Sequence, residues 1–258
     1  MNLIISGYGK MGKAIEKKAV EKGWKIAFVI DQQYEKETAW SGSPIYKSLN
    51  DVKMAAQANS VAVDFTHPDA AFDNIKNFAE KKIPLVIGTT GWLDKLDEAR
   101  RIVEKNESCL LWSSNFSLGV NLFYKIAEYA ASLMDKYDEY DAGGWEFHHN
   151  QKADSPSGTA KILAQKILAK SSRKTTAVYD KLERPPKPSE LHFASLRIGA
   201  VPGEHGLLFD CGADSIQIKH TARNRDGLVS GALSACKWLL EQSLLGKSGV
   251  WTFEEACE

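Results

Sequence analysis

The sequence has no excess of charge of either sign. Thirty-three Lys and Arg balance thirty-three Asp and Glu over 258 residues. Without an extended basic surface, the chain is not expected to bind nucleic acid or an anionic membrane surface. It also has no apolar run of the roughly 18 residues that a membrane span requires. We therefore predict neither a nucleic-acid partner nor a membrane partner.

Cysteine is scarce and widely spaced. The four cysteines are Cys109, Cys211, Cys236 and Cys257, and they form no C-x-x-C pair. This spacing is typical neither of a disulfide framework nor of a structural zinc site. The first residues lack the basic stretch and apolar stretch of a signal peptide. Together these features predict a protein of the reducing cytoplasm.

Apolar runs alternate with helical patterns over the first 115 or so residues. Strands are expected at Leu3–Ser6, Lys25–Ile30, Ser60–Phe65, Leu85–Gly88 and Cys109–Ser113. Helices are expected at Met11–Lys22, Asp69–Lys81 and Asp94–Lys105. Several strands are apolar throughout, as in parallel sheets covered on both faces. This α/β pattern predicts a doubly wound parallel sheet of the Rossmann type.

The pattern changes after Gly119, where strands begin to follow long helices. Helices are expected at Val120–Met134, from Pro156 onward and at Leu228–Leu245, and strands at Gly144–His149, Leu191–Gly199, Gly206–Gly212 and Ser215–Thr221, with a loop over Ser171–Ser189. We predict a second α+β domain at residues 119–225, with a mostly antiparallel sheet. Residues 1–118 and 226–258 are predicted to form the dinucleotide-binding Rossmann domain, because chain ends often meet.

A glycine-rich turn follows the first predicted strand. It reads Gly7-Tyr8-Gly9-Lys10-Met11-Gly12 and leads directly into a helix, as a dinucleotide fingerprint requires. Asp31 follows at the end of the next strand, where an acid can accept both ribose hydroxyls. Because a carboxylate repels a 2′-phosphate, NADH is the preferred cofactor. The nearby Lys36 keeps NADPH possible.

Two further strand ends are predicted to reach the same crevice. Gly88-Thr89-Thr90-Gly91 and Ser113-Ser114-Asn115-Phe116 each follow a predicted parallel strand. Ligands of open α/β sheets bind outside those ends, and small hydroxyl side chains could bind a nicotinamide or its ribose. Ordinary turns rich in Gly and Thr would have the same composition.

The densest group of reactive side chains runs from Glu146 to Ala160. It contains His148, His149 and Lys152, and then Ser157-Gly158-Thr159 at an expected helix start, with Pro156 as the first helical residue and Asp154 or Ser155 as its cap. Backbone N–H groups at a helix start bind anions. From His148 to Lys174 there are six Lys or Arg and one acid, Asp154. This local excess of positive charge predicts a small dianionic ligand.

This segment also allows two other interpretations. The paired histidines could form half of a metal site completed by His192, His205 or His220, but neither cysteines nor paired acids lie nearby, and we predict no metal. Ser157 is not expected to be a nucleophile, because no G-x-S-x-G turn surrounds it.

These motifs resemble the 4-hydroxy-tetrahydrodipicolinate reductase (dihydrodipicolinate reductase) family of bacterial diaminopimelate and lysine biosynthesis. The resemblance covers nearly the whole chain, and its most specific part is Glu146-x-His148-His149-x-x-Lys152-x-Asp154-x-Pro156-Ser157-Gly158-Thr159-Ala160. It also includes Gly7–Gly12, Asp64-Phe65-Thr66, Gly88–Gly91, Asn115-Phe116-Ser117, Gly119-Val120-Asn121, Gly203-Glu204-His205 and His220-x-x-x-x-Arg225. Two departures concern the choice between NADH and NADPH: the glycine loop is one residue shorter than in many relatives, and His67 stands where some members have an arginine near the cofactor.

The resemblance implies an NAD(P)H-dependent oxidoreductase that reduces 4-hydroxy-tetrahydrodipicolinate to tetrahydrodipicolinate, typically as a homotetramer assembled through the second domain. It implies an acid/base role for His148 and a proton-donor role for Lys152. His149, Ser157, Gly158 and Thr159 would hold the dicarboxylate substrate. The cofactor would be bound by Gly7, Tyr8, Gly9, Lys10, Met11, Gly12, Asp31, Gly88, Thr89, Thr90, Ser113, Ser114, Asn115 and Phe116.

Two alternatives share the cofactor motif. Another small Rossmann oxidoreductase acting on amino acids would need no carboxylate site after the histidine pair. A non-catalytic NADH-sensing protein would keep the glycine loop and Asp31. The presence of both His148 and Lys152 as proton-donor candidates argues against the sensing protein.

Overall fold

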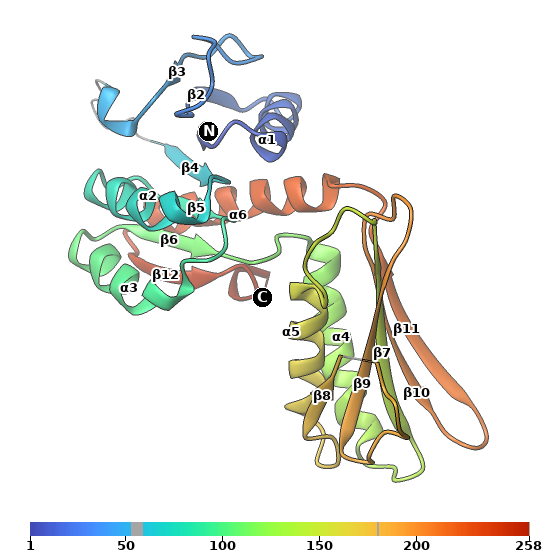
Figure 1. Ribbon diagram of the computed structural model, residues 1–258. Coiled ribbons are helices and arrows are strands. Elements are labelled where there is room, and N and C mark those ends of the chain that lie inside the picture. Colours follow the sequence, from blue (N-terminus) through green and yellow to red (C-terminus); the bar gives the residue numbers. More distant parts are fainter. Residues whose placement is uncertain (53–58, 180, 258) are drawn as a thin grey trace. The chain divides into compact units, whose positions relative to one another are not determined.

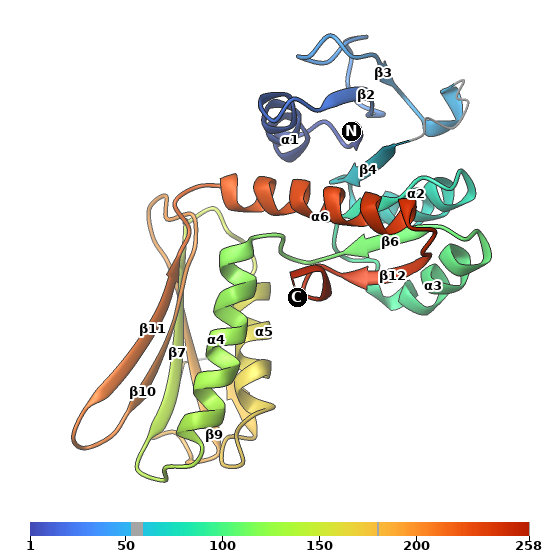
Figure 2. The ribbon, with the colours of Figure 1, turned by 180° about the vertical axis from the view of Figure 1, so that it is seen from behind.

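The computed structural model describes residues 1–52, 59–179 and 181–257, and it divides into two units (Figure 1, Figure 2). The first unit combines Met1–Ser117 with the segment from Leu228 onward, and the second is Leu118–Gly227. No helix in the described part of the chain is both long enough and apolar enough to cross a membrane.

The first unit is built on a seven-stranded sheet in the order β3-β2-β1-β4-β5-β6-β12. Its strands are β1 (Asn2–Ser6), β2 (Lys25–Ile30), β3 (Ile45–Tyr46), β4 (Ser60–Asp64), β5 (Leu85–Ile87), β6 (Cys109–Trp112) and β12 (Gly249–Thr252). Every neighbouring pair is parallel. The strand order reverses between β1 and β4, and ligands of such sheets bind at this point, outside the carboxyl ends of the strands.

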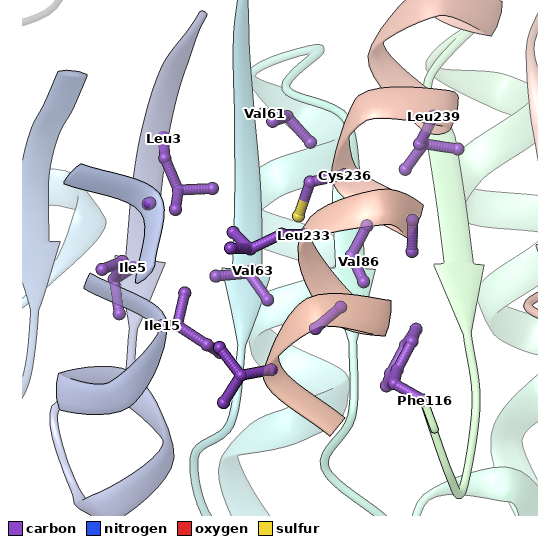
Figure 3. Close-up of a cluster of buried hydrophobic side chains, with 14 of the residues drawn as sticks. Leu3, Ile5, Ile15, Val61, Val63, Val86, Phe116, Leu233, Cys236 and Leu239 are labelled. Atoms are coloured by element: carbon purple, nitrogen blue, oxygen red, sulfur yellow. The ribbon is translucent and has the colours of Figure 1, made fainter. Parts of the chain in front are cut away.

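Helices cover both faces of this sheet. One face packs against α1 (Lys10–Glu21) and α6 (Asp226–Leu244), and the other against α2 (Pro68–Glu80) and α3 (Leu96–Lys105). Figure 3 shows the first of these two cores, in which Val63 and Val86 of the sheet lie beside Leu233 of α6. Burial on both faces explains why these strands are apolar throughout. Short 3-10 turns, η1 (Leu49–Asp51), η2 (Leu93–Lys95) and η3 (Glu255–Cys257), complete the unit.

The second unit places two helices on one face of a five-stranded sheet (Figure 1). The helices are α4 (Leu118–Met134) and α5 (Gly158–Leu168), and the sheet order is β11-β10-β7-β9-β8. The strands are β7 (Asp141–His148), β8 (Thr176–Val178), β9 (Glu190–Arg197), β10 (Glu204–Asp210) and β11 (Ser215–Thr221). The core between the layers contains Phe123, Leu163, Phe193 and Leu207, all buried.

The predicted fold class is confirmed, with one refinement in the second sheet. Strand β10 is antiparallel to β11 and to β7, whereas β9 is parallel to both β7 and β8. The sheet is therefore mixed rather than mostly antiparallel. Between β7 and its parallel neighbour β9 the chain passes through α5 and then β8. Strand β8 also lies inside the segment predicted to be a loop.

Candidate active site

The glycine-rich turn lies between β1 and α1, at the point where the strand order reverses. Gly7 has a φ of +88°, and a Cβ there would lie 2.5 Å from the carbonyl oxygen of Phe65. A Cβ on Gly12 would lie 2.1 Å from the carbonyl oxygen of Gly7. Both positions therefore require glycine for the turn and its packing. Gly9 is different, because a Cβ there would meet no atom within 4 Å.

The space beside Gly9 fits the phosphates of a dinucleotide. Gly9 is the N-cap residue of α1, and no side chain caps this helix. The first-turn N–H groups thus lack a capping side chain and lie at the positive end of the helix dipole. An anion is the natural partner for such a helix start. The residues present therefore fit the pyrophosphate of a nicotinamide dinucleotide.

Asp31 follows β2 and is bound to the glycine turn. Its Oδ2 accepts a hydrogen bond from the backbone N–H of Tyr8 at 2.7 Å. Its Oδ1 accepts from the backbone N–H groups of Gln33 at 2.9 Å and Tyr34 at 3.0 Å. A carboxylate offers about four acceptor positions, so these three bonds fix its orientation and leave capacity for a ribose hydroxyl.

A buried acid, Asp64, ties the neighbouring strand ends together. Its carboxylate is fully buried and accepts hydrogen bonds from Ser6, Asn74 and the hydroxyl of Thr89, the last at 2.7 Å. The Thr89 hydroxyl in turn accepts from the backbone N–H of Thr66 at 2.8 Å. Thr89 therefore shapes the strand ends through its side chain, whereas Thr90 is exposed.

The other predicted cofactor residues also lie at carboxyl ends of this sheet. Gly88 follows β5, and a Cβ there would lie 2.2 Å from the ring of Phe65. Ser113 and Ser114 follow β6, and the Ser113 hydroxyl donates to the carbonyl oxygen of Asn115. Phe116 is buried and packs against Phe253 with ring centroids 5.1 Å apart. Lys10 is exposed, and Met11 is half-buried on α1.

The predicted acid/base residue, His148, is the last residue of β7 and is buried. Its Nδ1 lies 2.8 Å from Oε2 of Glu146, which is fully buried two residues earlier on the same face of the strand. Burial works against a charged carboxylate, but the close contact with His148 and the hydrogen bonding from Ser157 outweigh it and hold the pKa of Glu146 well below its usual range. Glu146 is therefore a buried anion beside His148.

The start of α5 differs from the prediction. The helix begins at Gly158 and its N-cap is Ser157, whose hydroxyl accepts from the backbone N–H of Ala160 at 3.1 Å. Pro156 is thus outside the helix, and neither Asp154 nor Ser155 is the cap. Serine is a strong N-cap residue, whereas the Asp154 side chain pairs with Lys152 instead.

One of the three predicted anion-binding N–H groups is also engaged. The backbone N–H of Ser157 donates to Oε1 of Glu146 at 3.0 Å, so it is not available to a ligand. Gly158 is exposed and Thr159 half-buried, and they are the first two residues of the helix. Their backbone N–H groups point along the helix axis toward its start, where an anion is favoured.

Lys152 and His149 lie in the loop between β7 and α5. The Lys152 ammonium is 2.7 Å from Oδ1 of Asp154, and its side chain is 24% exposed. His149 directly follows the end of β7 and is half-buried. Its carbonyl oxygen accepts from the backbone N–H of Lys152 at 3.1 Å, which holds the two residues in one turn.

His205 of β10 adds a second buried imidazole to this site. Its ring is 5.0 Å from that of His148, and its Nε2 is 3.1 Å from the hydroxyl of Ser157. Burial, reinforced by the positive charge that His148 carries when it is protonated, lowers the pKa of His205 to about 3. His205 is therefore neutral near pH 7, and its 3.6 Å approach to Glu146 is not an ion pair.

The same side chains have the spacing of a metal-binding group. Ligand atoms of Glu146, His148 and His205 lie within 4.8 Å of one another. The guanidinium of Arg197 already contacts Oε1 of Glu146 at 2.9 Å, and its positive charge disfavours a cation on that carboxylate. Oε1 of Glu146 is thus occupied by protein donors, whereas Oε2 of Glu146 and Nδ1 of His148 make no hydrogen bond of good geometry among the described residues.

The structure thus gathers the predicted cofactor residues at one edge of the first unit's sheet and the predicted substrate residues at one end of the second unit. The sequence patterns alone predict no role for Glu146, Arg197 or Asp64, whose side chains connect the strands and turns at these two places. Glu146 could have been found from the alternation of strand side chains, which puts it on the same face as His148.

A Rossmann sheet with a dinucleotide turn, joined to a unit with clustered acid/base groups, defines a nicotinamide-dependent oxidoreductase. Comparison with known proteins makes the class specific. Residues 1–116 match the family model described as dihydrodipicolinate reductase, N-terminus, and residues 119–256 match the model for its C-terminus. The chain belongs to the dihydrodipicolinate reductase family, which confirms the resemblance found in the motifs.

Individual relatives agree with this assignment. The chain is 37% identical over 255 residues to the 4-hydroxy-tetrahydrodipicolinate reductase of Christiangramia forsetii, covering 99% of this chain and 97% of the relative. It is 35% identical over 270 residues to the enzyme of the same name from Archaeoglobus fulgidus, covering all of both chains. A dipicolinate-bound dihydrodipicolinate reductase from Paenisporosarcina sp. TG-14 has the same fold, with a TM-score of 0.78, 23% identity and coverage of 99% and 98%.

Proposed function

We propose that this chain reduces 4-hydroxy-tetrahydrodipicolinate to tetrahydrodipicolinate, with His148 as the acid/base residue and Lys152 as the proton donor. The single observation that carries these roles is the clustering of a buried histidine, a lysine and a helix start in one segment, β7 to α5. The lysine's ammonium and the amides of Gly158 and Thr159 offer positive charge and hydrogen-bond donors to a small dicarboxylate.

The reaction needs the groups found here. The 4-hydroxyl group leaves as water, which gives the more unsaturated ring, and a bound reduced nicotinamide would supply a hydride to an electron-poor carbon of that ring. Negative charge then develops toward the ring nitrogen or enamine, and a proton must be delivered there. His148 and Lys152 can each carry that proton at a ring nitrogen or an ammonium. His149 and the start of α5 would hold the two carboxylates and reduce the cost of burying a dianion.

NADH is the preferred cofactor in this proposal, and NADPH remains usable. Asp31 places a negative charge where the adenosine ribose is expected, and a 2′-phosphate there would be repelled. The residues after it, Gln32 and Gln33, are uncharged. Lys36 is the nearest following cation and would give only partial compensation. Residues 1–118 and 226–258 are the dinucleotide-binding domain, and residues 119–225 bind substrate.

We also propose that the chain assembles as a homotetramer through the second domain. Helices α4 and α5 pack on one face of the five-stranded sheet, and apolar side chains remain exposed on its strands or at their ends. Leu196 is 47% exposed, Ile198 52% and Ile216 40%. Exposed apolar side chains of this kind are typical of surfaces that contact another subunit. Light scattering at micromolar concentration would test the subunit number.

The cysteines fit a cytoplasmic location in this proposal. Cys109 and Cys236 are buried, free thiols, as is usual for proteins of a reducing compartment.

One assay tests the reaction itself. The substrate is generated from pyruvate and aspartate semialdehyde by the preceding synthase, and oxidation of NADH or NADPH is followed at 340 nm. The chain should oxidise both, NADH with the higher kcat/KM, and no oxidation of either would refute the proposal. His148→Ala and Lys152→Ala should lower kcat far more than they weaken NADH binding, and an equal loss of NADH affinity would contradict their assigned roles.

A further inference from the structure

Glu146 connects three elements of the second unit through one buried carboxylate. It lies on β7, and its Oε1 accepts from the backbone N–H of Ser157 at 3.0 Å and from Nη2 of Arg197 on β9 at 2.9 Å. Its Oε2 lies 2.8 Å from Nδ1 of His148. The carboxylate thus touches the residue before α5, the neighbouring strand and the acid/base candidate.

The distance to His148 fixes where that imidazole carries its proton. The 2.8 Å contact does not have the angle of a good hydrogen bond, and neither atom has another hydrogen-bond partner among the described residues. At this distance a bare ring nitrogen and a carboxylate oxygen would repel each other through their lone pairs, so the contact favours a hydrogen on Nδ1. In the neutral ring, Nε2 is then the unprotonated atom. Nε2 faces Gly203, where a Cβ would lie 3.0 Å away. The nitrogen that exchanges a proton is therefore the one on the side kept open by glycine.

We propose that Glu146 is a positioning residue: it directs the exchangeable proton of His148 to Nε2 and stabilises the imidazolium. Through Oε1 the same carboxylate holds the start of α5 against β7. This inference rests on the proposed acid/base role of His148. It adds that proton transfer depends on a carboxylate that touches neither substrate nor cofactor.

A purely structural role is the competing explanation, and the chain contains a matched example of one. Glu190 on β9 accepts from Nη2 of Arg184 at 2.7 Å and from the backbone N–H of Lys187 at 2.8 Å, and no histidine contact is recorded for it among the described residues. It has the same pattern as Glu146: one arginine and one backbone N–H. Glu190→Gln therefore measures the cost of neutralising such a carboxylate.

Glu146→Gln separates the two explanations by geometry. Ser157 N–H and Arg197 are both donors, so the glutamine oxygen must face them. Its NH2 group then faces His148 and donates to Nδ1, which moves the ring hydrogen of the neutral histidine to Nε2. The prediction is an inverted tautomer together with the loss of the negative charge beside the imidazolium.

The test combines ¹⁵N NMR of histidine-labelled protein with steady-state kinetics. The wild-type His148 signal, assigned by its absence in His148→Asn, should show the Nδ1–H tautomer, and Glu146→Gln should show Nε2–H. The kcat of Glu146→Gln should fall about 100-fold, within the range of acid–base catalysis, while the substrate KM changes less than threefold. Glu190→Gln should keep both the Nδ1–H signal and the kcat.

Several results would overturn the inference. A wild-type Nε2–H tautomer would do so without any variant, even if Glu146→Gln failed to fold. An unchanged tautomer in Glu146→Gln, or a loss of kcat matched by Glu190→Gln, would also do so. Failure of the wild-type chain to reduce the substrate would refute the proposed function and not this inference. The two failures can be told apart because the NMR measurement of the tautomer requires no turnover.

Discussion

The ammonium of Lys152 lies 2.7 Å from the carboxylate of Asp154, two residues further along the loop between β7 and α5. Burial opposes ionisation of Asp154, but the hydrogen bond from Lys152 outweighs it and holds the pKa of Asp154 below its usual value. The pair keeps the positive charge in place in the loop that leads to α5. Because the pairing depends on positive charge, an arginine at position 152 can keep it. A substitution there can therefore test the charge of Lys152 separately from its role as a proton donor.

Lys152→Arg should keep the charge and lose the proton donor. A guanidinium can retain the pairing with Asp154 but does not release a proton at neutral pH. We expect the substrate KM to stay within about threefold and kcat to fall about 100-fold or more. Lys152→Met should impair both values, and Lys161→Ala, an exposed lysine on α5, should change neither. Steady-state kinetics with all three variants would measure this, and full activity of Lys152→Arg would exclude lysine as the donor.

Asp31→Ser should change the choice of cofactor. The Asp31 carboxylate is held by N–H groups of the glycine turn and of its own loop, so its negative charge has a fixed position. Removing it removes the repulsion of a 2′-phosphate. The ratio of kcat/KM for NADH to that for NADPH should fall tenfold or more. Glu35→Gln, a nearby exposed acid, is the control, and an unchanged ratio in Asp31→Ser would show that Asp31 does not set the preference.

The sequence was most informative where burial imposes a simple pattern. The strands of the parallel sheet are apolar on both faces, so β1, β2, β4, β5 and β6 were predicted within a residue or two. Strands β3, β8 and β12 were missed. They are only two to four residues long and half-exposed or exposed, so they carry little apolar signal. Their pairing with longer strands defines them, and that pairing depends on tertiary structure.

The site residues also fall into two groups: those that one contiguous motif predicts, and those that only strand pairing brings together. His148, Lys152 and Ser157 belong to one contiguous motif and were predicted from it. Glu146 is linked to Arg197 across 51 residues, and this contact follows from the parallel register in which His148 of β7 is opposite Arg197 of β9. The register between β7 and β9 depends on how the strands pair in the folded chain, so a residue pattern in the sequence does not predict it. The predicted start of α5 is wrong. A proline is common at the first helical position, but Pro156 precedes the helix and Ser157 forms its cap.

His205 should make stability depend on pH below neutrality. Burial lowers its pKa to about 3, whereas an unfolded histidine titrates near 6.5. Protons therefore bind the unfolded chain first, and stability that is complete above pH 6.5 is lost as the pH falls toward 3. Between pH 6.5 and 5 the loss should reach up to about 2 kcal/mol.

Urea unfolding at pH 7.5 and pH 5 would measure this contribution. His205→Gln should be less stable than wild type at pH 7.5 but lose less stability between the two pH values. His67→Gln is the control for the pH dependence, because that side chain is 76% exposed. Loss of its cap on α2 can lower the stability at both pH values, but the difference between them should stay as in wild type. Equal pH dependence in wild type and His205→Gln would show that His205 is not held neutral by the fold.

Gly203→Ala should impair proton transfer at His148 without touching the cofactor residues. Gly203 has a φ of +157°, and a Cβ would lie 3.0 Å from Nε2 and 3.3 Å from Cδ2 of His148. The methyl group would crowd the nitrogen assigned to proton exchange, so kcat should fall tenfold or more while the Kd for NADH is unchanged. Gly199→Ala is the control for a methyl group at a positive φ without crowding. Its φ of +52° lies in the left-handed region, where the strain on alanine is smaller than at Gly203, and its Cβ would meet no atom within 4 Å. It should lower the melting temperature by a few degrees with little effect on kcat. Equal kcat losses in the two variants would attribute the effect to backbone strain rather than to crowding of Nε2.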